Sequence, residues 1–202
     1  MKFSLTAAYR SIMQGIEEGR QIKQNFHDFR EAMQNGDRAR AITVLENGKF
    51  AYDHARYILS DILQQDDTDV FAVAFRKFAG RNPNYIVSCH DSTGPDSPLY
   101  YETIPLLNYA MMQGAAKIAL SLAQNPQTNV AATGKTTKHA YVGGGFLSSG
   151  QTVKTEIPHI SALDLARERG MKEVEHAVRE RLADLKAAEA IEMKAQAARM
   201  VL

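Results

Sequence analysis

Apolar residues recur at helical spacing over most of the chain. In residues 161–178, a Leu and an Ala lie seven and four residues before Gly170, and two Val residues lie four and eight residues after it. This spacing is typical of two short amphipathic helices joined at a glycine. The same periodicity predicts one or two helices over residues 1–35, helix over 104–124, and helix from 161 to the C-terminus.

The spacing around Gly170 occurs elsewhere in the chain. Gly114 has matching residues at all the same offsets, namely Leu107, Ala110, Ile118 and Leu122. Gly36 has matches at Phe29, Ala32 and Val44 and one mismatch at Arg40. A further pair at 55–80 has a fitting length, but its register is open, because the glycine position is taken by Asp66, Asp67 or Thr68. Three copies of one spacing indicate an internal repeat, the signature of a solenoid.

Two segments interrupt the helical pattern, residues 81–102 and 125–159. Both are rich in turn-forming residues and contain short β-like pieces, "YIVS" in the first and "HAYV" and "QTVKTEI" in the second. Each follows the second helix of a pair, so we expect two long fingers side by side. Aromatic side chains are enriched among interface anchors, and the candidate partner-binding residues are Tyr85, His90, Tyr100, Tyr101, His139, Tyr141 and Phe146.

The repeated spacing resembles the ankyrin repeat, a β-turn and two antiparallel helices in roughly 33 residues. "SALDLARERG" at 161–170 and "PLLNYAMMQG" at 105–114 are similar to the family line TPLH-x-A…G, and "EAMQNGDRARAITVLENG" is similar to its helix–Gly–helix stretch. Asn108 and Asp164 stand where the family often has His, and neither copy keeps the Thr-Pro pair.

The resemblance implies an all-α fold, an ankyrin-like repeat solenoid of three to four antiparallel helix pairs with two long β-hairpin-like finger loops and a long C-terminal helix. We expect an N-terminal helical cap at 1–26, the repeat domain at 27–185 and a C-terminal helical tail at 186–202. An apolar stripe at Val174, Val178, Leu182 and Leu185 favours a terminal helix that caps the stack. Beyond the stripe, a cap and a projecting helix for a partner or for dimerisation both stay open.

Composition excludes several classes of function. The 24 Lys and Arg residues balance 23 Asp and Glu residues, so no strong basic field exists to attract nucleic acid or anionic lipid. The single cysteine, Cys89, excludes an intrachain disulfide and favours a reducing compartment. No apolar run is long enough for a membrane span, and "MKFSLTAAYR" is too short for a signal peptide. We therefore expect a cytoplasmic protein.

The family resemblance implies a non-catalytic protein–protein interaction module, an adaptor or scaffold, with no cofactor and with a protein partner whose identity the sequence does not give. A small stand-alone ankyrin-type protein without a leader is also similar to the effectors that intracellular bacteria inject into host cells. That reading places the protein in the host cell cytoplasm.

An enzyme is the alternative, a hydrolase or transferase that uses Cys89 with a histidine from the other loop, His139 or His159. Cys89 and His90 are adjacent on an extended segment and point to opposite faces, so they do not form a nucleophile–base pair. "TGKTT" at 133–137 lacks the upstream glycine of a phosphate loop, which favours a turn. The six histidines show no paired metal-ligand spacing, so no metal site is predicted.

Overall fold

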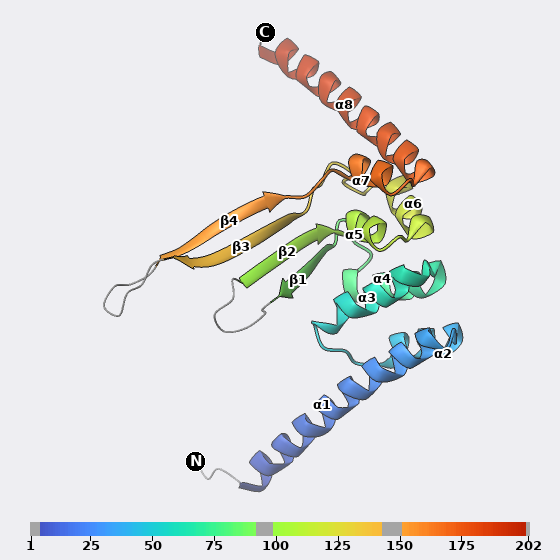
Figure 1. Cartoon of the computed structure of the whole chain (residues 1–202), viewed down its shortest axis with the longest axis vertical. Helices are drawn as coiled ribbons and strands as arrows, with labels where there is room; N and C mark the ends of the chain where they lie inside the picture. The colour runs from blue at the N-terminus through green and yellow to red at the C-terminus, as the bar shows by residue number, and fades with distance from the viewer. Residues whose placement is uncertain (1–4, 92–98, 143–150, 201–202) are drawn as a thin grey trace. The chain divides into compact units, whose positions relative to one another are not determined.

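The computed structural model describes residues 5–91, 99–142 and 151–200, with side chains over 13–88, 102–138, 153–196 and at Arg199. These residues form eight helices and one four-stranded antiparallel sheet (Figure 1). The helices are α1 (Leu5–Gln34), α2 (Arg38–Asn47), α3 (His54–Gln65), α4 (Thr68–Ala79), α5 (Leu106–Met112), α6 (Ala116–Gln124), α7 (Ala162–Glu168) and α8 (Lys172–Met200). The strands are β1 (Ile86–Asp91), β2 (Leu99–Pro105), β3 (Lys135–Val142) and β4 (Gln151–Pro158).

The fold is mostly helical, as expected, but the all-α class is wrong because the two fingers form a sheet. The chain divides into two compact units, the first ending at Arg81 and the second beginning at Asn82. The first unit holds α1–α4, and the second holds the sheet and α5–α8.

The first helix of each of the four helix pairs ends in the same turn. The residue at the turn has a positive φ in every pair, at Gly36 (69°), Asp66 (49°), Gly114 (84°) and Gly170 (67°). The next amide donates to the carbonyl five residues earlier, at Ala32 (2.8 Å), Ile62 (3.4 Å), Ala110 (3.0 Å) and Ala166 (2.9 Å). This is the Schellman ending of a helix. It confirms the three predicted glycine turns and assigns the turn of the 55–80 pair to Asp66.

The repeated apolar positions form the core of each pair. The four residues whose carbonyls accept the Schellman bond have no exposed surface. Seven residues before the turn, Phe29, Leu59 and Leu107 are buried, whereas Leu163 is half-buried. Four residues after the turn, Val70, Ile118 and Val174 are buried. Arg40, the mismatch in the first copy, is exposed.

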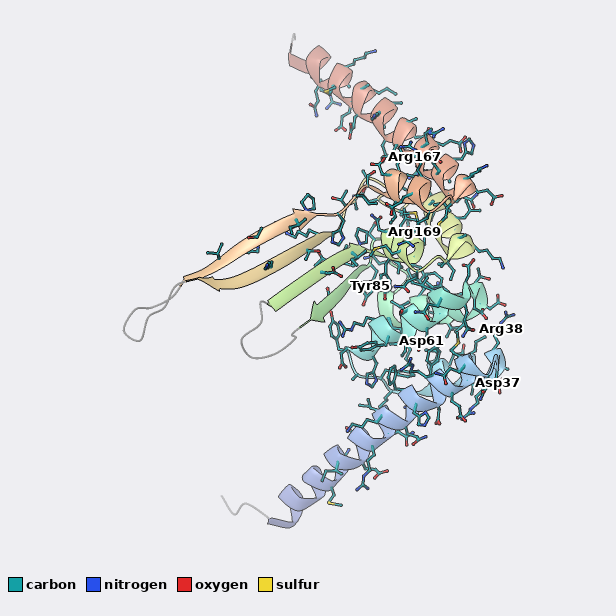
Figure 2. All side chains as sticks on the ribbon, viewed as in Figure 1. Asp37, Arg38, Asp61, Tyr85, Arg167 and Arg169 are labelled. Atoms are coloured by element: carbon teal, nitrogen blue, oxygen red, sulfur yellow. The ribbon has the colours of Figure 1, made fainter. Side chains whose placement is uncertain are left out.

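Equivalent helices pack on one another in each unit. In the first unit α1 packs on α3 and α2 packs on α4, and in the second unit α5 packs on α7 and α6 on α8. Ion pairs join the two pairs of the first unit, from Arg30 to Asp61 at 2.9 Å and from Arg76 to Glu46 at 3.1 Å. Figure 2 shows Asp61 on α3, and Arg38 at the start of α2, after the turn that joins the two helices of the first pair. The two residues of each ion pair are about 30 residues apart in the sequence.

The long helices α1 and α8 are continuous. Helix α1 runs through residue 26 and α8 runs through residue 185 without a break, so the backbone does not mark the expected cap and tail boundaries. Near the N-terminal end of α1, Met13 and Ile16 are about half exposed, at 44% and 45%. Among the described residues, no helix combines the length and apolar character needed to cross a bilayer.

The strand order is β1-β2-β3-β4, so the two predicted hairpins lie side by side. Strand β2 pairs with β3 from Leu99 opposite His139 to Thr103 opposite Lys135, which merges the two hairpins into one sheet. The prediction of a turn for "TGKTT" is wrong from Lys135 onwards, because β2 offers this segment an open edge to pair with.

Candidate interaction surface

The sheet is fixed to the second unit by the inner ends of its strands. Val87 on β1 and Ile104 on β2 are each 1% exposed, so β1 begins and β2 ends in the core of this unit. The Tyr85 carbonyl accepts a 2.9 Å hydrogen bond from the Leu106 amide, which ties the start of the first hairpin to the start of α5. The first hairpin therefore extends from a packed base rather than from a free loop.

The side chain of Asn84 links the bases of the two hairpins. Its Nδ2 donates to the Gln127 carbonyl at 2.9 Å, and its Oδ1 accepts from the Asn129 amide at 2.6 Å. An amide side chain supplies both a donor and an acceptor, and no carboxylate can replace it in this arrangement. Asn84 thereby holds the segment after α6 against the residues that enter β1.

Gly134 lies immediately before β3, close to the end of β2 and to His159 after β4. A Cβ at this position would lie 2.7 Å from both the Thr103 carbonyl oxygen and His159 Nδ1, so only glycine fits without displacement. His159 Nε2 is 2.7 Å from Thr136 Oγ1, and Thr136 Oγ1 donates to Glu102 at 3.3 Å. A polar chain of three side chains therefore crosses the base of the sheet.

The structure brings most of the predicted contact residues to one sheet. Tyr85 is half-buried immediately before β1, at the base of the sheet (Figure 2). His90 is opposite Tyr101 in the backbone register, and Asp91 is opposite Tyr100. His139 and Tyr141 lie on β3. Phe146 and the side chains of His90, Tyr100, Tyr101, His139 and Tyr141 lie outside the described residues.

The alternative site at Cys89 lies on β1. Cys89 is opposite Glu102 on β2, and Glu102 is opposite Thr136 on β3. The Cα atoms of Cys89 and Thr136 are thus two strand spacings apart, about 10 Å, and His159 is engaged with the Thr136 hydroxyl. The side chains of Cys89 and His139 lie outside the described residues, so catalysis by Cys89 stays a prediction. Among the residues that are described, no cluster of His, Cys, Asp and Glu is suited to hold a metal ion.

The outer strand β4 carries a small network of charges. Glu156 Oε1 accepts from Lys154 Nζ at 2.6 Å and from Lys135 Nζ at 3.0 Å. These two hydrogen bonds lower the pKa of Glu156 to about 2. The carboxylate stays ionised across the physiological range, so this edge of the sheet keeps a fixed pattern of charges.

A partly exposed aromatic cluster, which sequence reasoning missed, lies on α1 and α3 of the first unit. Phe26 stacks on His54 with ring centroids 4.2 Å apart, and Tyr57 is tilted against Phe26 at 6.3 Å. Arg30 lies over Phe26 and Arg56 lies over Tyr57. Tyr57 is 44% exposed. The cluster has no local pattern in the sequence, because the residues that pack on Phe26 belong to a helix that begins nearly thirty residues later.

A shallow groove of about 630 Å³ runs between α6 and α8. Its lining mixes apolar residues such as Leu120 with both signs of charge, including Lys172, Glu180 and Arg181. Arg181 Nη2 donates to the Pro126 carbonyl at 2.6 Å and helps hold α8 in place. This groove lies where α8 packs on α6.

No family model, curated protein or solved structure matches the chain.

Proposed function

We propose that the protein is a non-catalytic protein–protein interaction module built on an ankyrin-like repeat solenoid of three to four helix pairs. The observation that carries the proposal is the fourfold recurrence of the same helix ending, at Gly36, Asp66, Gly114 and Gly170. It is supported by the packing of equivalent helices in each unit. A repeat protein buries its core in this way, with each repeat closing its neighbour.

The position of the hairpins also supports an ankyrin-like arrangement. The family unit is a β-turn followed by two antiparallel helices. Here a hairpin precedes the pair α5–α6 and another precedes α7–α8. The two hairpins are enlarged versions of the family turn, and they differ from it by pairing with each other through β2 and β3.

The sheet is the proposed contact surface. Binding residues are often found on loops that a rigid scaffold positions, and this sheet has a buried base at Val87 and Ile104. Its outer part carries the aromatic positions Tyr100, Tyr101 and Tyr141. Tyrosine provides a large contact area at little cost in side-chain entropy. The partner is another protein, which this chain binds in the cytoplasm, or in the host cell cytoplasm if the chain is an injected effector.

Two trimmed variants test the proposal. In the first, residues 139–154 are replaced by Asn-Gly, which joins the paired residues Lys138 and Thr155 by a two-residue turn. In the second, residues 90–101 are replaced in the same way, which joins Cys89 to Glu102. Both variants keep the buried base of the sheet. We expect both to stay folded by circular dichroism and to lose the proteins that the wild-type chain captures from a lysate.

Two substitutions serve as controls. Tyr57→Ala alters the aromatic cluster on α1 and α3 and is expected to leave capture unchanged. If both trimmed variants still capture the proteins and Tyr57→Ala does not, the binding site is the aromatic cluster on α1 and α3 and not the sheet. Cys89→Ser is also expected to leave capture unchanged, whereas a hydrolysis of the captured protein that disappears in Cys89→Ser would support the enzyme instead.

A further inference from the structure

Strand β4 forms an open edge of the sheet. It pairs with β3 on one side, and no other described strand pairs with its outer side (Figure 1). The side chains of residues 153–158 are all exposed. An uncovered strand edge is a template for pairing with another chain, and proteins normally blunt or cover it.

The direction of the backbone groups on β4 follows from one hydrogen bond. The His159 amide donates to the Gly134 carbonyl at 2.9 Å, and the register continues without a bulge from Pro158 opposite Lys135 to Gln151 opposite Val142. Successive residues of a strand direct their N–H and C=O groups to opposite sides. Odd-numbered residues of β4 therefore bond to β3, and Lys154 and Glu156 present their backbone groups outward.

The side chains on this edge are self-complementary about Thr155. Lys154 and Glu156 flank it on one face of the sheet, and Val153 and Ile157 lie with Thr155 on the other face. Val153 is 45% exposed and Ile157 is 52% exposed. A two-fold rotation about Thr155 brings position 154 of one strand opposite position 156 of the other, and position 153 opposite position 157. Each Lys then faces a Glu, and each Val faces an Ile.

We propose that β4 pairs antiparallel with β4 of a second copy of this chain, with the two-fold axis at Thr155. Lys154 of one copy then lies opposite Glu156 of the other, and both pairs exchange backbone N–H···O bonds. Val153 lies opposite Ile157, and Thr155 faces Thr155 as a non-hydrogen-bonded pair. The two sheets become one continuous sheet.

Neighbouring registers are disfavoured. Centring the pairing on residue 154 places Lys154 opposite Lys154, and centring it on residue 156 places Glu156 opposite Glu156. Like charges directly opposite each other destabilise a strand pair. Registers shifted so that odd residues oppose even ones leave the outward N–H and C=O groups without partners.

Pro158 limits the length of the contact. Proline has no N–H to donate, so the ladder weakens where Pro158 of one strand meets the other copy. The interface is therefore short, smaller than a standard protein–protein interface, and the dimer is expected to form reversibly with rising concentration.

Cysteine cross-linking tests the register. In a Cys89→Ser background, Thr155→Cys places two thiols on a non-hydrogen-bonded pair with Cα atoms about 4.5 Å apart, within reach of a disulfide. Val153→Cys in the same background is the matched control, because Val153 lies opposite Ile157 and is about 14 Å from its own copy. We expect a cross-linked dimer from Thr155→Cys under mild oxidation and none from Val153→Cys. No cross-linked dimer, or equal cross-linking of both variants, overturns the proposal.

A charge exchange tests the pairing without cysteine. Lys154→Glu and Glu156→Lys each place like charges opposite each other in a homodimer, and each is expected to raise the dimer dissociation constant by roughly tenfold or more. An equal mixture of the two variants restores both Lys–Glu pairs. Sedimentation equilibrium should therefore show dimer in the mixture and monomer in each variant alone. A wild-type chain that is monomeric at every concentration, or a mixture no more dimeric than its components, overturns the proposal.

Discussion

Arg38 Nε donates a 2.7 Å hydrogen bond to Asp67 Oδ2, and the other oxygen of Asp67 accepts the amides of Asp69 and Val70, each at 3.1 Å. One carboxylate thus caps α4 and joins it to the turn that follows α1. Burial raises the pKa of Asp67, but the two amides and the Arg38 guanidinium together outweigh it, so its pKa lies below the ordinary value of 3.8.

Asp67→Ala removes the cap of α4, and we expect a loss of about 1 kcal/mol in the free energy of unfolding, measured by urea titration. Arg38→Met should cost less, because Arg38 is 59% exposed and exposed ion pairs contribute little.

The pKa of Asp67 is lower in the folded than in the unfolded chain. Its charge therefore stabilises the fold above the unfolded pKa near 3.8, and this contribution disappears as the pH falls through the folded pKa. Asp67→Asn should accordingly differ most from the wild type at neutral pH and least in acid. A difference that grows in acid would contradict this assignment.

Ala166 has no exposed surface and lies where α7 meets its neighbours. Ala166→Leu should overpack this contact and lower the stability by roughly 1–3 kcal/mol. Ala183→Leu is the control, because Ala183 is exposed on α8 and the same change there should alter stability by less than about 0.5 kcal/mol. Thermal unfolding of both variants makes the comparison. Equal midpoints would show that the space beside Ala166 is not filled.

Gly170 has a φ of 67°, and a Cβ there would touch nothing within 4 Å. The cost of a substitution therefore comes from backbone strain rather than from a clash. Gly170→Asn should be tolerated, because Asn adopts the left-handed region readily, whereas Gly170→Val should be clearly worse. Denaturant midpoints should rank wild type, Asn and Val in that order. A Val variant as stable as the Asn variant would contradict a strain-based role.

The helix pairs were predictable because their signal is local. The apolar neighbours of the turn glycine all lie within eight residues of it, so the spacing around Gly114 and Gly170 identified both helices and the turn between them. The turn at Asp66 was not resolved, because three adjacent residues were suitable for it. Asp tolerates the left-handed conformation, and only the positive φ of Asp66 in the structure shows that the turn lies there and not at a neighbouring residue.

The sheet was only partly predictable because its pairing is not local. The β-like pieces indicated β1 and both strands of the second hairpin, but not β2, and nothing near Lys135 in sequence shows that it pairs with Thr103 on β2. The sequence from Gly134 onwards predicts a turn, and it forms a strand because its backbone pairs with the edge of β2. The cluster of Phe26, His54 and Tyr57 was missed for the same reason, since its members belong to different helices. Pairing between distant segments depends on packing that a single stretch of sequence does not encode.

The last part of α8 provides a test of the tail. Leu182 is half-buried and Leu185 is 37% exposed, and further along the helix Ile191 and Met193 are 69% and 67% exposed. Truncation after Leu185 should therefore change the free energy of unfolding by less than about 0.5 kcal/mol. Truncation after Glu175 is the contrasting variant, because it also removes Ala177 and Val178, which are 8% and 0% exposed. Burying a Val side chain is worth about 1.5–3 kcal/mol, so this second variant should unfold at a clearly lower temperature. If the first truncation already abolished cooperative unfolding, residues 186–202 would have to pack on the second unit, and the helix would act as a cap along its whole length.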